Sequence, residues 1–491
     1  MLMTLKNDAV RGISWTGTAA IFNIGIQIVQ LVVLARLLSP EDFGLMGILM
    51  LIIGFAQSFS DLGISAAIVA KQDISDNTLS SLYWLNVLFG IVLYIIIYFS
   101  IPIILHFFNE AKLIQLIPIG SLLFILGSGG VQFQMLLQKE LLFSILSRID
   151  MLSALVGALV TIAAAFYALG VWSLVYGQLS GALIRLLLLL YIAFLEKWLP
   201  KCHFSYEEVK PFLSFGLYQM GERCINYFNS KSDQMLIGSI LGTSTLGLYN
   251  FANNLVFQPS LRIFPVIINV MFPIFAKIQH DTKKMQNAYI KLLKILVALH
   301  SPIMVFMCIL SPVIIPYVFG DKWNDSIYIV QVLSIYVLIR STGSPVGSIQ
   351  LAKGRADLGF KWNLMLFFIT NPALYLTARI YGLNGIVWTL CGLMIIYGVA
   401  SYFYMIRTLI GKCGKEYSLA ILKPILISCI MGLGIYTAAF LSISGCLLIL
   451  VQLFIGIVLY YYGIKKLIPE LYSEVASVFL ERRLNLFAWR K

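Results

Sequence analysis

Four ionisable side chains lie in one otherwise apolar stretch, "FGLYQMGERCINYFNSKSDQMLIG" at residues 215–238. They are Glu222, Arg223, Lys231 and Asp233. Glu222, Asn226 and Asp233 follow one another at helical spacing, so in a helix they share one face. Cationic groups bind anions, carboxylates take up protons or cations, and amides exchange hydrogen bonds with hydroxyl groups. The spacing therefore predicts a polar binding face.

Comparable polar rows occur in three further apolar segments. The first row consists of Asn23, Gln27 and Gln30. The second consists of Gln57 and Asp61, and the third of Asn250, Asn254, Gln258 and Arg262. Steps of three and four residues keep each row on one helix face. Each segment is therefore predicted to present a stripe of hydrogen-bonding groups.

The composition decides which solvent surrounds these rows. Of the 491 residues, 60% are hydrophobic and 12% are charged, whereas about a quarter of a soluble domain is charged. A membrane-spanning helix takes about 20 apolar residues, and about fourteen such runs are present. The predicted spans are 12–37, 43–69, 80–105, 113–137, 145–167, 171–195, 211–240, 246–275, 295–319, 326–351, 358–378, 384–407, 419–441 and 446–464. The predicted fold class is therefore an all-α polytopic membrane protein.

The sequence contains no motif that indicates an enzyme. The sequence has no GxxxxGK[ST] motif for nucleotide phosphates, and its 4 histidines show no metal-ligand spacing. The 7 cysteines form no CxxC pair. The predicted outside connections are too short to carry a catalytic carboxylate cluster. We therefore expect a protein that is not an enzyme and that uses no cofactor or metal.

Lysine and arginine are distributed unevenly between the connecting loops. If the N-terminus is cytoplasmic, only Arg36, Lys112, Lys322 and Arg379 lie in outside connections, and most of the 35 lysines and arginines lie inside. The positive-inside rule then places both termini in the cytoplasm. The net charge of +13 is explained by this topology, so nucleic acid is not an expected partner.

Three short segments recur later in the chain in the same order. "LLSPEDFGLMGI" (37–48) aligns with "ILGTSTLGLYNF" (240–251) and matches Gly44 with Gly247. "ALGVWSL" (168–174) is similar to "LNGIVWT" (383–389), and "LLQKELLFSILSRID" (136–150) is similar to "QLAKGRADLGFKWN" (350–363). Because an even number of helices separates the copies, they form parallel repeats about an axis along the membrane normal.

The repeats define the expected domain organisation. The parts are an N-terminal six-helix lobe (1–195), a cytoplasmic linker (196–210), a C-terminal six-helix lobe (211–410), a final helix pair (411–466) and a basic cytoplasmic tail or interfacial helix (467–491). Corresponding helices of the two lobes then place the four polar rows around one central cleft, since a charge facing lipid costs at least a few kcal/mol. The alternative is that these side chains pair locally and hold the helices together.

The charges within the spans indicate the cargo of such a cleft. The cations are Arg148, Arg185, Arg223, Lys231, Arg262 and Arg340, and the acids are Asp61, Asp150, Glu222 and Asp233. The excess of cations favours an anionic group, and guanidinium pairs well with phosphate. For Arg148 and Arg185 the alternative is local pairing, of Arg148 with the neighbourhood of Asp150 or with the inner surface. The amides suit a sugar, whose hydroxyl groups both donate and accept hydrogen bonds.

Several segments resemble the Wzx-type polysaccharide flippases of the multidrug/oligosaccharidyl-lipid/polysaccharide exporter superfamily, in particular the colanic acid exporter branch. The matching segments are "VLARLLSPEDFGLMGI", "SDLGISAAIVAKQDIS", "LYWLNVLFGI", "MFPIFAKIQHDTKKM", "VFGDKWNDSI" and "IRSTGSPVGSIQLAKGRADLGFKWN". The resemblance implies two six-helix lobes about a cleft lined chiefly by helices one, two, seven and eight. It also implies movement of an undecaprenyl-diphosphate-linked oligosaccharide from the inner to the outer leaflet of the bacterial inner membrane.

This sequence departs from two related groups on its first helix. Drug exporters of the superfamily have an acid there for cation coupling, and flippases of peptidoglycan precursor have an arginine. This chain has Asn23, Gln27 and Gln30 instead. A grip on a diphosphate would then fall to Arg223, Lys231 or Arg262.

The leading hypothesis is a flippase that works by alternating access, with membrane lipid and the lipid-linked oligosaccharide as partners. The candidate substrate-binding residues are Arg223, Lys231, Arg262, Asn23, Gln27, Gln30, Gln57, Asn226, Asn250, Asn254, Gln258 and Arg340. The candidates for coupling to a proton or sodium ion are Asp61, Glu222 and Asp233. The polysaccharide polymerase machinery is a further candidate partner. The alternatives are a cation-coupled exporter of small amphiphiles or drugs, and a non-transporting scaffold for polysaccharide assembly.

Overall fold

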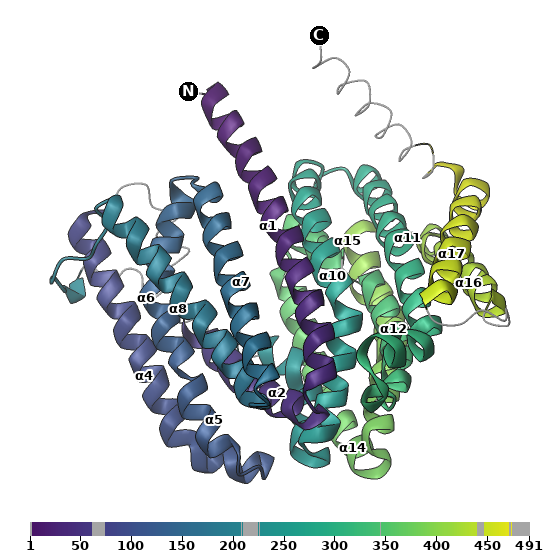
Figure 1. Ribbon diagram of the computed structural model, residues 1–491. Coiled ribbons are helices and arrows are strands. Elements are labelled where there is room, and N and C mark those ends of the chain that lie inside the picture. Colours follow the sequence, from purple (N-terminus) through teal and green to yellow (C-terminus); the bar gives the residue numbers. More distant parts are fainter. Residues whose placement is uncertain are drawn as a thin grey trace. The chain divides into compact units, whose positions relative to one another are not determined.

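The structure is a computed structural model that describes residues 2–60, 74–207, 209, 224, 226–343, 345–438, 446–470 and 473. Side chains are described for the same residues except 2–14, 58–60, 262–270, 356 and 446. All regular elements in this part of the chain are helices (Figure 1), which confirms the predicted all-α fold class.

The described residues contain 11 helical segments that are long and apolar enough to cross a membrane. The predicted spans 358–378 and 384–407 form one of them, because α14 (Ala356–Ser401) continues across a kink at Gly382. The predicted spans 211–240 and 246–275 include residues outside the described side chains. The predicted span 113–137 is divided at Ser121 into α5 (Leu113–Gly120) and α6 (Leu122–Lys139).

The chain divides into two compact units, residues 1–250 and 251–491. The first unit contains α1 (Leu2–Leu37), α2 (Pro40–Ser60), α4 (Asp76–Phe108), α5, α6, α7 (Phe143–Phe166), α8 (Val171–Leu195), helical residues 226–236 and a π-helical turn (Ile237–Leu241). Gly242, with φ at 87°, lets the chain turn into α10 (Thr243–Lys277). α10 begins in the first unit and continues in the second.

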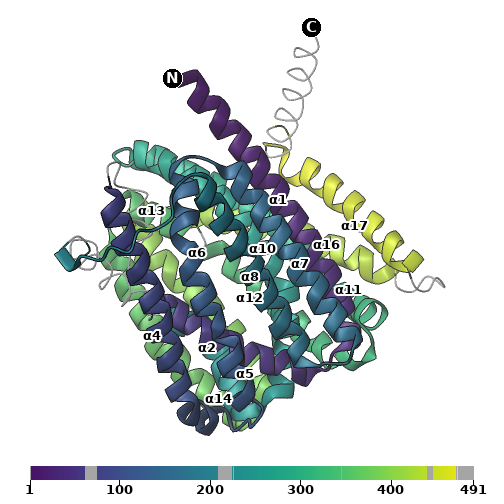
Figure 2. The ribbon, with the colours of Figure 1, turned by 60° about the vertical axis from the view of Figure 1, so that its left-hand side comes forward.

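Close helix packing holds the first unit together. α7 and α8 lie side by side (Figures 1 and 2), and a Cβ added at Gly177 of α8 would lie 1.7 Å from Thr161 Oγ1 of α7. A core of Leu82, Phe133, Ile149 and Leu189 joins α4, α6, α7 and α8. Small residues at a helix interface allow the close backbone approach on which association in a membrane depends.

The second unit contains α11 (Thr282–Ile314), a π-helical turn (Ile315–Phe319), a short 3-10 helix (Asp321–Trp323), α12 (Ser326–Gly343), α13 (Val346–Ala352), α14, a π-helical turn (Tyr402–Ile406), α15 (Arg407–Ile410), α16 (Gly414–Ala438) and α17 (Cys446–Leu467). Its main core includes Tyr289, Leu293 and Leu296 of α11 and Ile406. α16 joins α11 through a buried hydrogen bond of 2.7 Å from Ser428 Oγ to Ser301 Oγ.

The backbone adds a further likeness between the two halves of the chain. Gly170 has φ 56° and ψ −133°, and Gly382 has φ 59° and ψ −141°. Side chains with a Cβ avoid this conformation, so both positions require glycine. Each glycine directly precedes a helical segment, although the sequence comparison paired Gly170 with Gly385 and not with Gly382.

Candidate functional site

The structure describes most of the predicted site residues. Asn23, Gln27 and Gln30 lie on α1, Gln57 on α2, and Asn250, Asn254 and Gln258 on α10. Asn226, Lys231 and Asp233 lie in the helical residues before Gly242, and Arg340 lies on α12. Asp61, Glu222 and Arg223 lie outside the described residues. Arg262 lies in α10, but its side chain is not among those described.

The amide row of α1 is partly accessible. Asn23 and Gln30 are half-buried and Gln27 is exposed. Among the described side chains, the buried Oδ1 atom of Asn23 has no hydrogen-bond partner. A buried amide oxygen without a donor is unfavourable, so Asn23 has capacity to accept a hydrogen bond from a hydroxyl group or from water.

Asp233 is held by neighbours that the sequence pattern did not single out. Tyr249 Oη of α10 donates to Asp233 Oδ2 at 2.5 Å, and the Gln234 backbone N–H donates to Asp233 Oδ1 at 2.8 Å. Lys231 Nζ donates to Gln234 Oε1 at 3.4 Å. The sequence could have indicated Tyr249 as a partner of Asp233. The two residues are at similar distances along the chain from the turn at Gly242, so two helices that meet at this turn bring them to a similar level.

We expect Tyr249→Phe to destabilise the protein by about 1–3 kcal/mol, because it removes a hydrogen bond to a carboxylate and keeps the ring. Asp233→Asn is expected to cost less, since an amide oxygen still accepts from Tyr249. The measurement is the thermal unfolding midpoint of the purified protein, with Tyr381→Phe, whose side chain is 69% exposed, as the matched control. An equal midpoint for Tyr249→Phe and Tyr381→Phe would contradict the role of this hydrogen bond.

Other predicted binding residues have clear packing roles. A Cβ added at Gly47 of α2 would lie 2.0 Å from Asn250 Nδ2, so the buried Asn250 side chain fits against a glycine. Tyr227 Oη donates to the Leu51 carbonyl oxygen at 2.6 Å. These contacts join α2 to the two segments on either side of Gly242, and for Asn250 they favour the helix-packing alternative over contact with a cargo.

The remaining described candidates are exposed within apolar helices. They are Gln57, Asn226, Asn254, Gln258 and Arg340. In the second unit, the Arg340 guanidinium lies 5.5 Å from the Phe257 ring of α10 and donates to Tyr336 Oη at 3.3 Å. Polar side chains at membrane depth seldom face lipid. They usually line a water-filled space or contact a polar partner group.

The two glycines that the sequence comparison pairs, Gly44 and Gly247, lie against each other. A Cβ at Gly44 would lie 1.8 Å from the Thr243 carbonyl oxygen, and a Cβ at Gly247 would lie 1.7 Å from the Pro40 carbonyl oxygen. The two distances come from equivalent positions, so the N-terminal turns of α2 and α10 pack reciprocally, as residues do across a two-fold axis.

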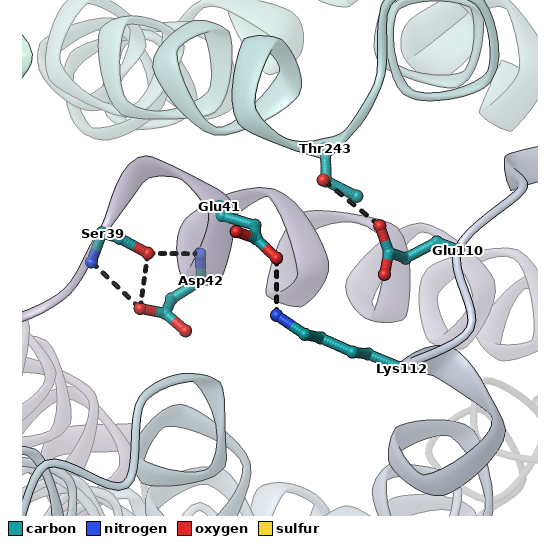
Figure 3. A network of polar contacts seen from close by, with 6 residues as sticks. All are labelled: Ser39, Glu41, Asp42, Glu110, Lys112 and Thr243. Atoms are coloured by element: carbon teal, nitrogen blue, oxygen red, sulfur yellow. Dashed lines mark hydrogen bonds and ion pairs between the residues drawn. The ribbon is translucent and has the colours of Figure 1, made fainter.

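A polar network surrounds the starts of these two helices (Figure 3). Ser39 Oγ donates to Asp42 Oδ2 at 2.7 Å and accepts from the Asp42 backbone N–H at 3.2 Å, which caps α2. Thr243 Oγ1, at the start of α10, donates to Glu110 Oε2 at 3.4 Å. Carboxylates beside helix N-termini interact favourably with the helix dipoles.

One ion pair links this network to the loop before α5. Lys112 Nζ lies 2.6 Å from Glu41 Oε1 (Figure 3), and this hydrogen bond raises the pKa of Lys112 above its ordinary value. Both side chains are about half exposed or more, at 60% and 46%, and such a pair contributes about 0–1 kcal/mol. The ion pair therefore adds little to the attachment of α2 to the loop before α5.

Comparison with known proteins gives a consistent result. A family model described as "Polysaccharide biosynthesis protein" matches residues 33–328. The chain is 34% identical over 426 residues to the lipopolysaccharide biosynthesis protein WzxC of Escherichia coli (strain K12), which covers 87% of this chain and 86% of the relative. It is 29% identical over 485 residues to the teichuronic acid biosynthesis protein TuaB of Bacillus subtilis (strain 168), which covers 96% of this chain and 98% of the relative.

A solved structure shows the same fold. The lipid II flippase MurJ in an inward closed conformation has a TM-score of 0.74 with 17% identity, and the match covers 94% of this chain and 100% of MurJ. These matches confirm the predicted multi-pass membrane fold. The family match and the WzxC match establish that the chain belongs to the polysaccharide biosynthesis protein family, among the Wzx-type members of the multidrug/oligosaccharidyl-lipid/polysaccharide exporter superfamily.

Proposed function

We propose that this protein is a lipid-linked oligosaccharide flippase. Its cargo would be an undecaprenyl-diphosphate-linked polysaccharide repeat unit, moved across the bacterial inner membrane by alternating access. The observation that carries the proposal is the 34% identity to WzxC along 87% of the chain. The accessible amides of α1 and α10 support it, because a glycan needs many donors and acceptors of hydrogen bonds.

The proposal assigns roles to the predicted residues. Lys231, Arg223 and Arg262 would hold the diphosphate, and Asn23, with its unpartnered buried oxygen among the described side chains, would hold a sugar hydroxyl group. Asp61, Glu222 and Asp233 remain the candidates for coupling to a proton or sodium ion, and the polysaccharide polymerase machinery remains a candidate partner.

The proposed transport cycle includes closure of the outer end. With both termini in the cytoplasm, the starts of α2 and α10 lie at the outer side of the membrane, because each follows an odd number of predicted crossings. Their contact at Gly44 and Gly247 would then keep that end closed while cargo enters from inside. Alternating access would then require these two helix starts to separate so that the cargo is released outside.

Complementation of a deletion strain tests the proposed function. We expect the deletion to abolish surface polysaccharide and to leave lipid-linked repeat units trapped at the inner leaflet. Wild-type protein is expected to restore the polymer, whereas Arg262→Ala or Asp233→Asn at matched expression restores little, because each removes a charge at membrane depth. Lys415→Ala, at an exposed lysine, is the control and is expected to restore the polymer fully.

The same experiment separates the alternatives. Normal polymer with altered drug sensitivity in the deletion strain would refute the flippase proposal and favour export of small amphiphiles. Loss of polymer in the deletion strain together with full activity of Arg262→Ala and Asp233→Asn would favour a scaffold.

A further inference from the structure

Three polar side chains that belong to none of the four rows meet among the membrane segments of the first unit. Arg185 Nη2 of α8 lies 2.9 Å from Asp150 Oδ1 of α7 and donates to Gln134 Oε1 of α6 at 3.3 Å. At 1.5 Å per residue, Arg185 lies about 15 Å along α8 from its end at Leu195. Asp150 lies about 10 Å along α7 from Phe143, and Gln134 lies about 8 Å along α6 from Lys139. The group therefore lies within apolar helical segments and not in a loop.

Arg185 lies on the inward face of α8. Leu189 and Ala193, on the following turns of that face, are 2% and 0% exposed, whereas Leu183 and Leu187 on the other face are 44% and 51% exposed. The side chains of Arg185 and Asp150 nevertheless remain 40% and 35% exposed. Partly exposed ionic side chains in a membrane helix are favoured where they face water or protein groups, because exposure to lipid is costly.

The Arg185 guanidinium is incompletely satisfied. It contacts Asp150 through Nη2 and not as a two-pronged fork. Its Nε atom is buried and has no hydrogen-bond partner among the described residues. A buried donor of a charged group without a hydrogen-bond partner is unfavourable, so the Nε–H group has capacity to donate to a further acceptor. Gln134 uses its oxygen toward Arg185, which leaves its amide N–H groups as further donors.

We propose that Arg185, Gln134 and Asp150 form an oxyanion-binding subsite in the first unit. A phosphate, diphosphate or carboxylate group of the cargo displaces Asp150 and takes a two-pronged pair of hydrogen bonds from the guanidinium, the geometry for which arginine is suited. Asp150 holds Arg185 in place when the subsite is empty and competes with the ligand. The identity of the cargo rests on the proposed function, whereas the subsite rests on the three side chains.

Binding to the purified full-length protein tests the subsite. The probes are undecaprenyl diphosphate, undecaprenyl phosphate and glucuronate, and the measurement is the dissociation constant. We expect Asp150→Asn to tighten binding, because it removes the competing carboxylate. Arg185→Gln in the Asp150→Asn background is expected to weaken binding about tenfold or more relative to Asp150→Asn alone, and Arg185→Lys to weaken it less.

Arg148→Gln is the matched control within the same unit. Arg148 lies 5.0 Å from the Trp15 ring, is exposed, and shares a face of α7 with the exposed Leu152, Leu155 and Leu159. It is expected to leave binding unchanged. The double variant carries no unpaired buried charge, so a folding defect does not obscure its result.

The outcomes have defined meanings. A response to undecaprenyl diphosphate alone identifies the lipid-borne diphosphate as the ligand, and a response to glucuronate identifies a sugar acid. Unchanged binding of every probe in Asp150→Asn and in the double variant would overturn the proposal. These measurements do not depend on transport. A negative binding result would therefore overturn the subsite without overturning the proposed function, which the deletion-strain experiment tests separately.

Discussion

Gly247→Ala is expected to abolish most of the polymer production that wild-type protein restores to a deletion strain. The added methyl group would lie 1.7 Å from the Pro40 carbonyl oxygen, so the start of α10 must move away from α2. Overpacking of this kind costs about 1–3 kcal/mol, and here it opposes the arrangement that is proposed to close the outer end. Gly44→Ala is expected to have the same effect, since its methyl group would lie 1.8 Å from the Thr243 carbonyl oxygen.

Two comparisons isolate this steric effect. In Gly25→Ala the added methyl group has nothing within 4 Å, and alanine is the better helix former, so normal polymer is expected. The double variant Gly44→Ala/Gly247→Ala is expected to lose less than the sum of the single losses, because one separation of the helices relieves both overlaps. Normal polymer in Gly247→Ala would show that this contact is not part of the working cycle.

Trp323→Ala is expected to have the largest effect on stability, a loss of about 3–5 kcal/mol. Trp323 is 0% exposed and its ring stacks on Phe251 at a centroid distance of 4.2 Å. Phe251 also meets Phe319 edge to face at 5.0 Å. Removing the indole leaves a cavity between α10 and the short helix Asp321–Trp323, and the surrounding rings cannot fill it.

The check is the thermal unfolding midpoint of purified protein, compared with Trp388→Ala. Trp388 is 52% exposed, so its replacement removes the same side chain with a much smaller loss of buried contact. A similar decrease in both variants would mean that the aromatic cluster around Trp323 does not determine stability.

The sequence alone determined the membrane class, the helices and their polar faces. These properties are local: a spanning helix satisfies its backbone hydrogen bonds within one segment, and its faces follow from helical spacing. The repeat comparison even paired Gly44 with Gly247, although it gave no reason for the two glycines to touch. The rows also contained Asn23, whose side-chain oxygen has no hydrogen-bond partner among the described side chains, and Asn250, which packs against Gly47. The same periodic pattern predicted both residues, so the pattern does not distinguish a binding residue from a packing residue.

Only the tertiary structure decided which polar groups meet. The pairing of Asp233 with Tyr249 depends on the turn at Gly242, and the pairing of Arg185 with Asp150 depends on how α7 packs against α8. Glycine contacts allow the pairing of Arg185 with Asp150, because Gly177 lets α8 approach α7 closely. Spacing within a helix carries information about its own faces, but contacts between helices arise from side-chain fit across distant segments, which no local pattern contains.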